Sequence, residues 1–86
     1  MKDLTDEQRK RSGINSGAVI IDKVDAGVGL TAGLRKGDII LQIDNDEVNS
    51  VDQVISFFNE INSARKIPIL IKRQNGQLFI VLDIEK

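Results

Sequence analysis

The stretch Ala32-Gly33-Leu34-Arg35-Lys36-Gly37-Asp38-Ile39-Ile40 decides the fold of this 86-residue chain. It leads from a glycine-containing turn into an apolar run that continues to Asp44. Gly37 suits a backbone position with positive φ, which glycine adopts without a steric penalty. The β-branched residues after it favour extended backbone. The stretch therefore predicts a tight turn followed at once by a strand over residues 38–44.

Upstream of this stretch the sequence predicts a short helix and a strand. Thr5 and Gln8 have the spacing of a capping box, in which each side chain accepts a hydrogen bond from a free N–H of the first turn. A helix over Asp6–Ser12 follows, and Gly13 is suited to a left-handed stop. Ala18–Val24 is dense in β-branched residues, which predicts a largely buried strand.

The segment Ala26–Asp38 holds four glycines and predicts one tight helical turn. A phosphate-binding loop is the alternative, since Gly27, Gly29 and Gly33 approach a dinucleotide-binding pattern. That pattern requires a shorter last gap and a long following helix, whereas here Gly37 and Asp38 end the segment. The spacing therefore argues against nucleotide binding.

Downstream, Asn45-Asp46-Glu47 predicts a turn, and Ser50 predicts the start of the main helix over Val51–Ala64. Gln53 has the spacing to complete a second capping-box pair with Ser50. The apolar residues of one helix face are Val51, Val54, Ile55, Phe58 and Ile61. Phe57 lies off this face, and its ring is expected to be covered by a neighbouring loop.

The C-terminal third predicts a β-hairpin. Ile67–Arg73 alternates, so that its isoleucines share one face of a strand. Asn75-Gly76 favours a type I′ turn, and Leu78–Ile84 is the returning strand. With no repeat or linker, residues 1–86 are predicted to form a single α+β domain. Its small twisted antiparallel sheet, or open barrel, is capped by one main helix and one short helix.

Composition excludes several kinds of chemistry. The chain has no cysteine and no histidine, so it offers no disulfides, no cysteine-based zinc site and no histidine general base. Its net charge is −1, from 12 basic and 13 acidic residues, which provides no overall field for nucleic acid. No apolar run approaches the roughly 18 residues that a membrane span needs. No catalytic residue, metal site or cofactor is predicted.

Two charge clusters also favour structural roles. Arg9, Lys10 and Arg11 share a segment with acidic residues, so we expect a mixed-charge, solvated helix and no nucleic-acid patch. The acidic turn at residues 44–47 lacks the ligand spacing and central glycine of an EF-hand loop. It therefore does not predict a calcium site.

The motifs resemble those of a known family. The opening stretch, followed by Ile43-Asp44-Asn45-Asp46-Glu47-Val48 and Ser50-Val51, resembles the AGL-x-x-GD-x-I, I-N-G-x-x-V and S-V pattern of PDZ domains in bacterial proteases. The early helix at Leu4-Thr5-Asp6-Glu7-Gln8-Arg9, ahead of the strand containing Val19-Ile20-Ile21, resembles the Do/HtrA (DegP/DegQ-like) group. The resemblance spans nearly the whole chain.

Three departures from the family pattern stand out. Gly27-Val28-Gly29 replaces a Ser-Pro-Ala step, and Asp46 replaces a glycine of the I-N-G turn. In the family, a Tyr-Leu-Gly-Val strand that pairs with the ligand precedes the early helix, whereas here only Met1-Lys2-Asp3 precede Leu4. We therefore expect the chain to be a piece of a longer protein that lacks most of its ligand-pairing strand.

The resemblance implies a peptide-binding module without catalytic residues. It places Val51, Ile55 and Phe58 along a groove that captures extended or C-terminal hydrophobic segments of misfolded proteins. The parent protein would be a serine endopeptidase of the bacterial periplasm or cell envelope, which the domain helps to regulate. Alternatives are a domain used mainly for oligomer assembly, or one from another membrane-associated protease or secretion component. Self-association through an exposed sheet edge is also expected.

Overall fold

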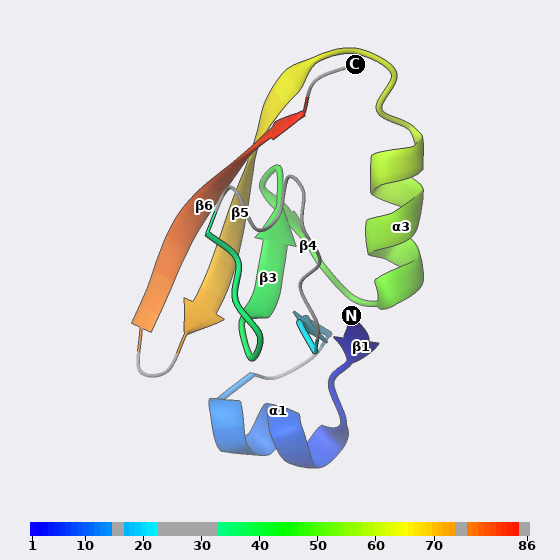
Figure 1. Ribbon diagram of the computed structural model, residues 1–86. Helices are drawn as coiled ribbons and strands as arrows, with labels where there is room; N and C mark the ends of the chain where they lie inside the picture. The colour runs from blue at the N-terminus through cyan, green and yellow to red at the C-terminus, as the bar shows by residue number, and fades with distance from the viewer. Residues whose placement is uncertain (15–16, 23–32, 74–75, 85–86) are drawn as a thin grey trace.

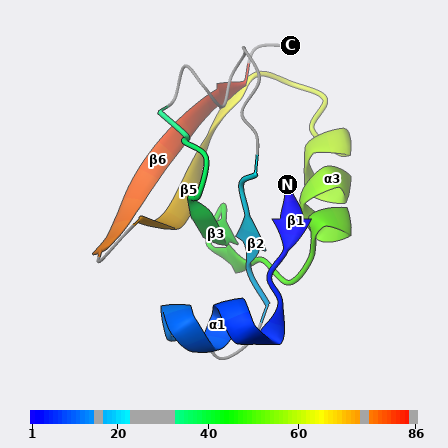
Figure 2. The same ribbon diagram turned by 60° about the horizontal axis from the view of Figure 1, so that its bottom comes forward.

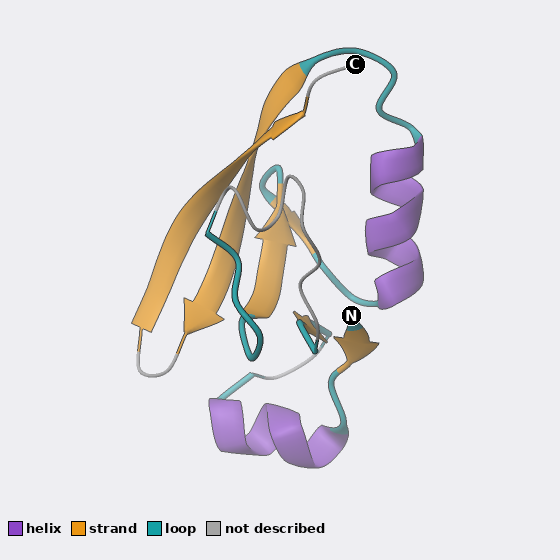
Figure 3. Cartoon of the chain, viewed as in Figure 1, coloured by secondary structure: helices purple, strands orange, loops and turns teal. Residues whose placement is uncertain are grey.

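The computed structural model describes residues 1–14, 17–22, 33–73 and 76–84 of the chain (Figure 1). Along the sequence the elements are β1 (Lys2–Asp3), α1 (Asp6–Ser12), β2 (Val19–Ile20), β3 (Ile39–Ile43), β4 (Asp46–Glu47), α3 (Val51–Asn59), β5 (Arg65–Arg73) and β6 (Gly76–Ile84). Figure 3 shows one sheet with α3 alongside it and α1 below it, at the end where β1 and β2 lie. The predicted α+β class, with an antiparallel sheet, a main helix and a short helix, is confirmed.

The sheet is open and entirely antiparallel. Its strand order is β1-β2-β3-β5-β6, with β4 paired to β3. The β5–β6 hairpin is the longest pairing, and its last pair joins Arg73 to Gly76. Gly76 is thus a strand residue and does not have positive φ, so its predicted place in the turn is wrong by one position. Asn75, the other residue of that predicted turn, lies outside the described residues.

The main core lies between the sheet and α3 (Figure 2). Alternation along β5 directs Ile67, Ile69 and Ile71 into it, and each is at most 1% exposed. Val54 contributes the fully buried side chain of α3. The isoleucine face predicted from the sequence is confirmed, because strand alternation leaves Leu70 and Lys72 on the other face.

Helix α1 is held by its two ends and buries none of its own residues. The Gln8 N–H donates to Thr5 Oγ1 at 3.1 Å, and the Thr5 N–H donates to Gln8 Oε1 at 3.0 Å, which confirms the capping box. At the other end Gly13 has a φ of 70°, as predicted. Leu4 and Ile14 flank the helix and pack into a second, smaller core cluster.

Helix α3 begins as predicted at Ser50, whose hydroxyl oxygen accepts the Gln53 N–H at 3.2 Å. The second capping box is incomplete, because Gln53 Oε1 accepts the N–H of Asn49 instead of Ser50. The predicted continuation to Ala64 is also wrong, since the helix ends at Asn59. Ile61 turns into the core, and the residues after it are exposed, so no packing favours further helical turns there.

The opening stretch of the sequence folds as a turn that feeds β3. Gly37 has a φ of 94°, its N–H donates to Ile21 O at 2.7 Å, and β3 starts two residues later. The upstream strand is shorter than predicted, because Ala18 has positive φ and β2 covers only Val19–Ile20. The end of that predicted strand and the helical turn predicted after it fall at residues 23–32, outside the described residues.

The β3–β4 connection lies one residue earlier than predicted. Asp44 and Asn45 have positive φ, whereas Asp46 and Glu47 pair with β3 as a short strand. Short polar side chains tolerate left-handed backbone, which explains why this turn forms without glycine. Asp44 also forms an ion pair with Arg65 of β5, with 2.6 Å between Oδ2 and the guanidinium nitrogen.

Candidate functional site

The candidate groove lies where β1 and α3 come side by side (Figures 1 and 2). β1 is the outermost strand on this side of the described sheet, and it pairs with β2. Asp3 connects it to the helix, because its Oδ1 accepts the N–H of Val51 at 2.8 Å. The last residue of the edge strand is thus fixed against the first turn of α3.

An apolar cavity of about 250 Å³ lies in this region. Its lining residues are Met1, Ile21, Leu34, Ile40, Val54, Phe58, Ile69, Leu82 and Ile84. They come from α3, from the core face of β3, β5 and β6, and from three residues outside the strands, Met1, Ile21 and Leu34. An apolar cavity of roughly 150 Å³ already holds a benzene-sized guest. This cavity can therefore accept one large aliphatic or aromatic side chain.

The three predicted groove residues occupy different positions on α3. Phe58 is half-buried and lines the apolar cavity. Ile55 is 47% exposed, which makes it the most exposed apolar side chain of the helix. Val51 packs partly against the core, with its amide bonded to Asp3. Phe58 alone is brought into the cavity, while Val51 and Ile55 lie on the helix outside it.

Sequence reasoning missed several lining residues. Leu82 and Ile84 could have been found from the alternation of the last strand, because they share a face with the buried Ile80. Leu34 and Met1 carry no such signal. Their proximity to Phe58 depends on how distant segments pack.

A buried ion pair positions the turn that carries Leu34. The Asp38 carboxylate accepts the Arg35 N–H at 2.8 Å and both Nε and a terminal nitrogen of Arg73, at 2.8 and 2.6 Å. Arg73 also donates to the carbonyl oxygen of Gly33 at 2.8 Å. The segment around Leu34 is therefore tied directly to β5. This contribution of Arg73 was not predicted.

The same contacts set the charge of Asp38, the buried acidic residue of the described core. Burial alone would raise the pKa of its carboxyl group. The hydrogen bonds from Arg73 and from the Arg35 amide, together with the positive charges of these residues, outweigh burial and lower that pKa. The hydrogen bond to Asp38 in turn raises the pKa of Arg73. Both shifts favour the charged forms, so the pair is a charged contact that fixes this turn to β5.

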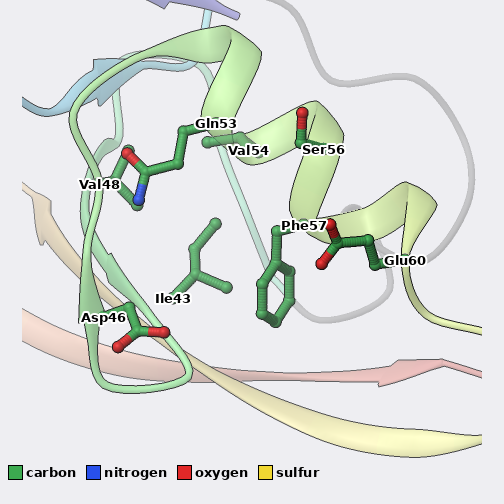
Figure 4. Close-up of a pocket in the computed structure, with 8 residues that line it drawn as sticks. All are labelled: Ile43, Asp46, Val48, Gln53, Val54, Ser56, Phe57 and Glu60. Carbon is green, nitrogen blue, oxygen red and sulfur yellow. The ribbon is translucent and has the colours of Figure 1, made fainter.

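A second cavity, of about 230 Å³, lies between α3 and the β3–β4 hairpin (Figure 4). It is lined by Ile43, Asp46, Val48, Gln53, Val54, Ser56, Phe57 and Glu60. Phe57 was expected to be covered by a loop. It is half-buried, packs edge-on against Phe58 with 5.4 Å between ring centroids, and faces this cavity.

Two further features concern only the residues that the structure describes. No group of three or more acidic, histidine or cysteine side chains is arranged to hold a metal ion there. Neither α1 nor α3 is long and apolar enough to cross a membrane.

Sequence comparison relates the chain to segments of longer, known proteins. No protein-family model matches it. It is 33% identical over 84 residues to a probable periplasmic serine endoprotease DegP-like of Hahella chejuensis, in an alignment that covers 98% of this chain and 18% of that protease. It is 30% identical over 82 residues to the protein of the same name in Pseudomonas putida F1, covering 95% and 17% of the two chains. The chain thus spans less than a fifth of the length of these relatives.

A solved structure shows the same fold. The HtrA-type protease AlgW, determined with a decapeptide, superposes on this chain with a TM-score of 0.80. The alignment covers 98% of this chain and 26% of AlgW, at 23% sequence identity. The chain therefore has the PDZ-like α+β fold of one segment of an HtrA-type protease, as the sequence motifs predicted.

Proposed function

We propose that this chain, which has a PDZ-like fold and aligns along nearly its whole length with one segment of DegP-like serine endoproteases, is the peptide-binding module of such a protease. The mechanism is β-augmentation, in which an extended peptide adds a strand to a sheet edge. Main-chain hydrogen bonds to the edge provide affinity, and side-chain pockets provide selectivity. Here the edge is β1, which is only two residues long, and the opposite wall is α3, so we expect this chain to bind a peptide weakly.

The observation that supports this proposal most strongly is the apolar cavity beside the edge strand. Phe58 lines it, and Ile55 lies one turn earlier on α3 with nearly half of its side chain exposed. An apolar side chain at the end of a peptide would enter the cavity, and the third-last side chain would contact Val51 and Ile55. The preferred ligands are thus extended or C-terminal segments with apolar residues at the last and third-last positions.

A second part of the proposal concerns the longer protein to which this chain would belong. The relatives are named as probable periplasmic serine endoproteases, and this chain aligns with only a small part of each. We propose that the parent protein is a serine endopeptidase of the periplasm or cell envelope, with its catalytic residues outside this segment. The module would present unfolded segments of misfolded proteins to that catalytic part and regulate it.

NMR titration tests the groove. A ¹⁵N-labelled 86-residue chain is titrated with a hexapeptide that has a free carboxyl terminus and valine at its last and third-last positions. The matched control peptide carries aspartate at both positions. The expected result is a saturable shift of the amide signals of residues 2, 3, 51, 55 and 58 with the valine peptide only.

Two charge substitutions on α3 provide the protein controls. Ile55→Asp should abolish the response, because an exposed carboxylate would face the ligand where an apolar contact is proposed. Ser56→Asp places the same charge one residue further along the helix, at another exposed position, and should leave the response unchanged. Shifts that are equal for both peptides, or that survive Ile55→Asp, would contradict the groove assignment.

Self-association is a second candidate, and the far edge of the sheet favours it. β6 is the outermost strand of the described sheet on that side, with Phe79 62% and Val81 52% exposed. Long, apolar edge strands without lysine or proline readily pair with another chain. Sedimentation velocity should show a concentration-dependent dimer that Val81→Lys removes. A strict monomer at millimolar concentration would exclude this assembly role.

A further inference from the structure

The second cavity combines an apolar floor with an acidic rim (Figure 4). Its apolar lining comes from Ile43, Val48, Val54 and Phe57. The side chains of Asp46 and Glu60 lie on either side of the Phe57 ring, one from β4 and the other from the end of α3. This arrangement suits a ligand that has a hydrocarbon stem and a cationic head.

Both rim carboxylates are available for a ligand. Within the described parts of the chain, the side chains of Asp46 and Glu60 make no hydrogen bond or ion pair. Arg65 is engaged by Asp44, the residue that begins the β3–β4 turn. Gln53 is held by the backbone on both sides, through the Asn49 N–H and the Glu47 carbonyl oxygen. It therefore forms a fixed wall and does not neutralise the rim.

The end of α3 adds to this negative field. The last carbonyl groups of a helix carry partial negative charge, which a basic side chain usually offsets. The last turn of α3 contains no basic residue, and Glu60 occupies its C-cap position. The last turn of α1, by contrast, holds three basic residues. The field at this cavity thus combines two carboxylates with the negative end of a helix, and all three favour a cation.

We propose that this cavity is a second binding site, which accepts an arginine side chain exposed on a partner protein. The guanidinium group lies over the Phe57 ring between Asp46 and Glu60, and its methylene groups contact Ile43 and Val48. Arginine fits better than lysine, because its planar group stacks on aromatic rings and shares hydrogen bonds between two carboxylates. The cavity of about 230 Å³ has room for such a side chain. This site is independent of the peptide groove proposed above.

Small arginine analogues test the proposal directly. The ¹⁵N-labelled 86-residue chain is titrated with N-acetyl-arginine methylamide and, separately, with the citrulline and lysine equivalents. Citrulline has nearly the shape of arginine but no charge. The arginine analogue should give saturable shifts at residues 43, 46, 57 and 60, with a dissociation constant in the millimolar range that increases with salt. The citrulline analogue should give no saturable shift, and the lysine analogue should bind more weakly.

Variants at the rim identify the binding groups. Asp46→Asn and Glu60→Gln change exposed carboxylates, and each should weaken the arginine analogue by about threefold, as expected for a partly solvated ion pair. Phe57→Leu keeps the site apolar but should also weaken binding, because the stacking surface is lost. Asp83→Asn, at an exposed position of β6, is the matched control and should have no effect.

Three outcomes would overturn the proposal. The first is an equal response to arginine and citrulline, and the second is binding that survives the double variant Asp46→Asn/Glu60→Gln. The third is a set of shifts confined to β1 and the groove side of α3, which would assign the analogue to the peptide groove instead. None of these outcomes bears on the valine-peptide titration, so the two proposals fail or hold separately.

Discussion

Helices α1 and α3 begin with the same local arrangement and are then held in different ways. In each, a hydroxyl side chain, Thr5 or Ser50, accepts the backbone N–H of a glutamine three residues later. α1 continues with acidic residues in its first turn, basic residues in its last turn and a left-handed glycine at its end. α3 has no basic residue in its last turn and no glycine at its end, but it buries Val54.

This difference shows which helix can serve recognition. α1 is held by its own cap residues, by a hydrogen bond from Lys72 of β5 to the carbonyl oxygen of Ser12, and by the packing of Leu4 and Ile14 in the smaller core cluster. α3 depends on packing against the sheet and leaves its C-terminal end unneutralised. Both cavities described above lie along α3, and Val54 lines each of them. The helix with the fewest local constraints is therefore the one with surfaces available for ligands.

The largest loss of stability is expected when the buried side chain of α3 is shortened. Val54→Ala should lower the free energy of unfolding by about 2 kcal/mol, because two buried methyl groups are lost and a space remains between the helix and the sheet. Urea unfolding followed by circular dichroism measures the change. The comparison substitution is Glu7→Ala on α1, which should cost less than about 0.5 kcal/mol because that helix buries none of its own residues. Similar losses for both would contradict the contrast between the helices.

Removing a charge should lower the free energy of unfolding more at Asp38 than at any position on α1. The ion pairs and caps of α1 are exposed or only partly buried, whereas the Asp38 carboxylate is buried against Arg73. Asp38→Asn keeps the shape of the side chain but removes the charge, so it should cost about 1.5 kcal/mol at pH 7. Urea unfolding of the variant and of the original chain at pH 7 gives this difference.

The pH dependence of that difference has a definite sign. Folding lowers the pKa of Asp38, so its stabilising contribution is fully present above the ordinary carboxyl pKa. The contribution is lost as the pH falls below about 4 and through the lowered folded value, because protonation removes the charge that Arg73 binds. Urea midpoints of Asp38→Asn and the original chain should converge as the pH falls below about 4. A constant difference across this range would show that Asp38 acts by shape alone.

Removal of the N-cap hydroxyl group from either helix should cause an intermediate loss of stability. Ser50→Ala should cost about 1 kcal/mol of global stability, since α3 is part of the main core. Thr5→Ala removes an equivalent hydrogen bond but should cost roughly half as much, because α1 can fray without exposing residues of its own. Hydrogen exchange should show faster exchange confined to residues 6–12 for Thr5→Ala. Equal global losses would mean that α1 is as firmly coupled to the core as α3.

The elements that could be predicted from sequence are those with local causes. The bounds of α1 follow from its capping box and Gly13, and both contacts are made within the helix and its flanking residues. The turn before β3 likewise depends on Gly37, whose positive φ was expected. The isoleucine face of β5 follows from strand alternation. In each case, the residues that determine the structure are neighbours in the chain.

The predictions from sequence were wrong where contacts between residues distant in the chain determine the structure. α3 ends at Asn59 because Ile61 packs into the core, and the hairpin register places Gly76 opposite Arg73. The candidate site was predictable only as the helix face that carries Ile55 and Phe58. Its cavity also requires residues from both ends of the chain, and the tie between Asp38 and Arg73 joins residues that are 35 positions apart. No local sequence pattern predicts contacts between residues so far apart in the chain.

The smallest effect is expected when a charge is removed from the C-terminal end of either helix. The resulting changes in stability should have opposite signs in α1 and α3. Glu60→Gln removes a negative charge from the negative end of α3, so it should stabilise the chain by about 0.3 kcal/mol. Lys10→Gln removes a positive charge from the same end of α1 and should destabilise by a similar amount, about 0.3 kcal/mol. In a domain of this size each change corresponds to roughly 1–2 °C in Tm, which differential scanning calorimetry resolves. Both shifts should shrink in 1 M NaCl, because exposed charges are screened. Destabilisation by Glu60→Gln would mean that the carboxylate has an intramolecular partner, and an arginine from another protein would then have to displace it.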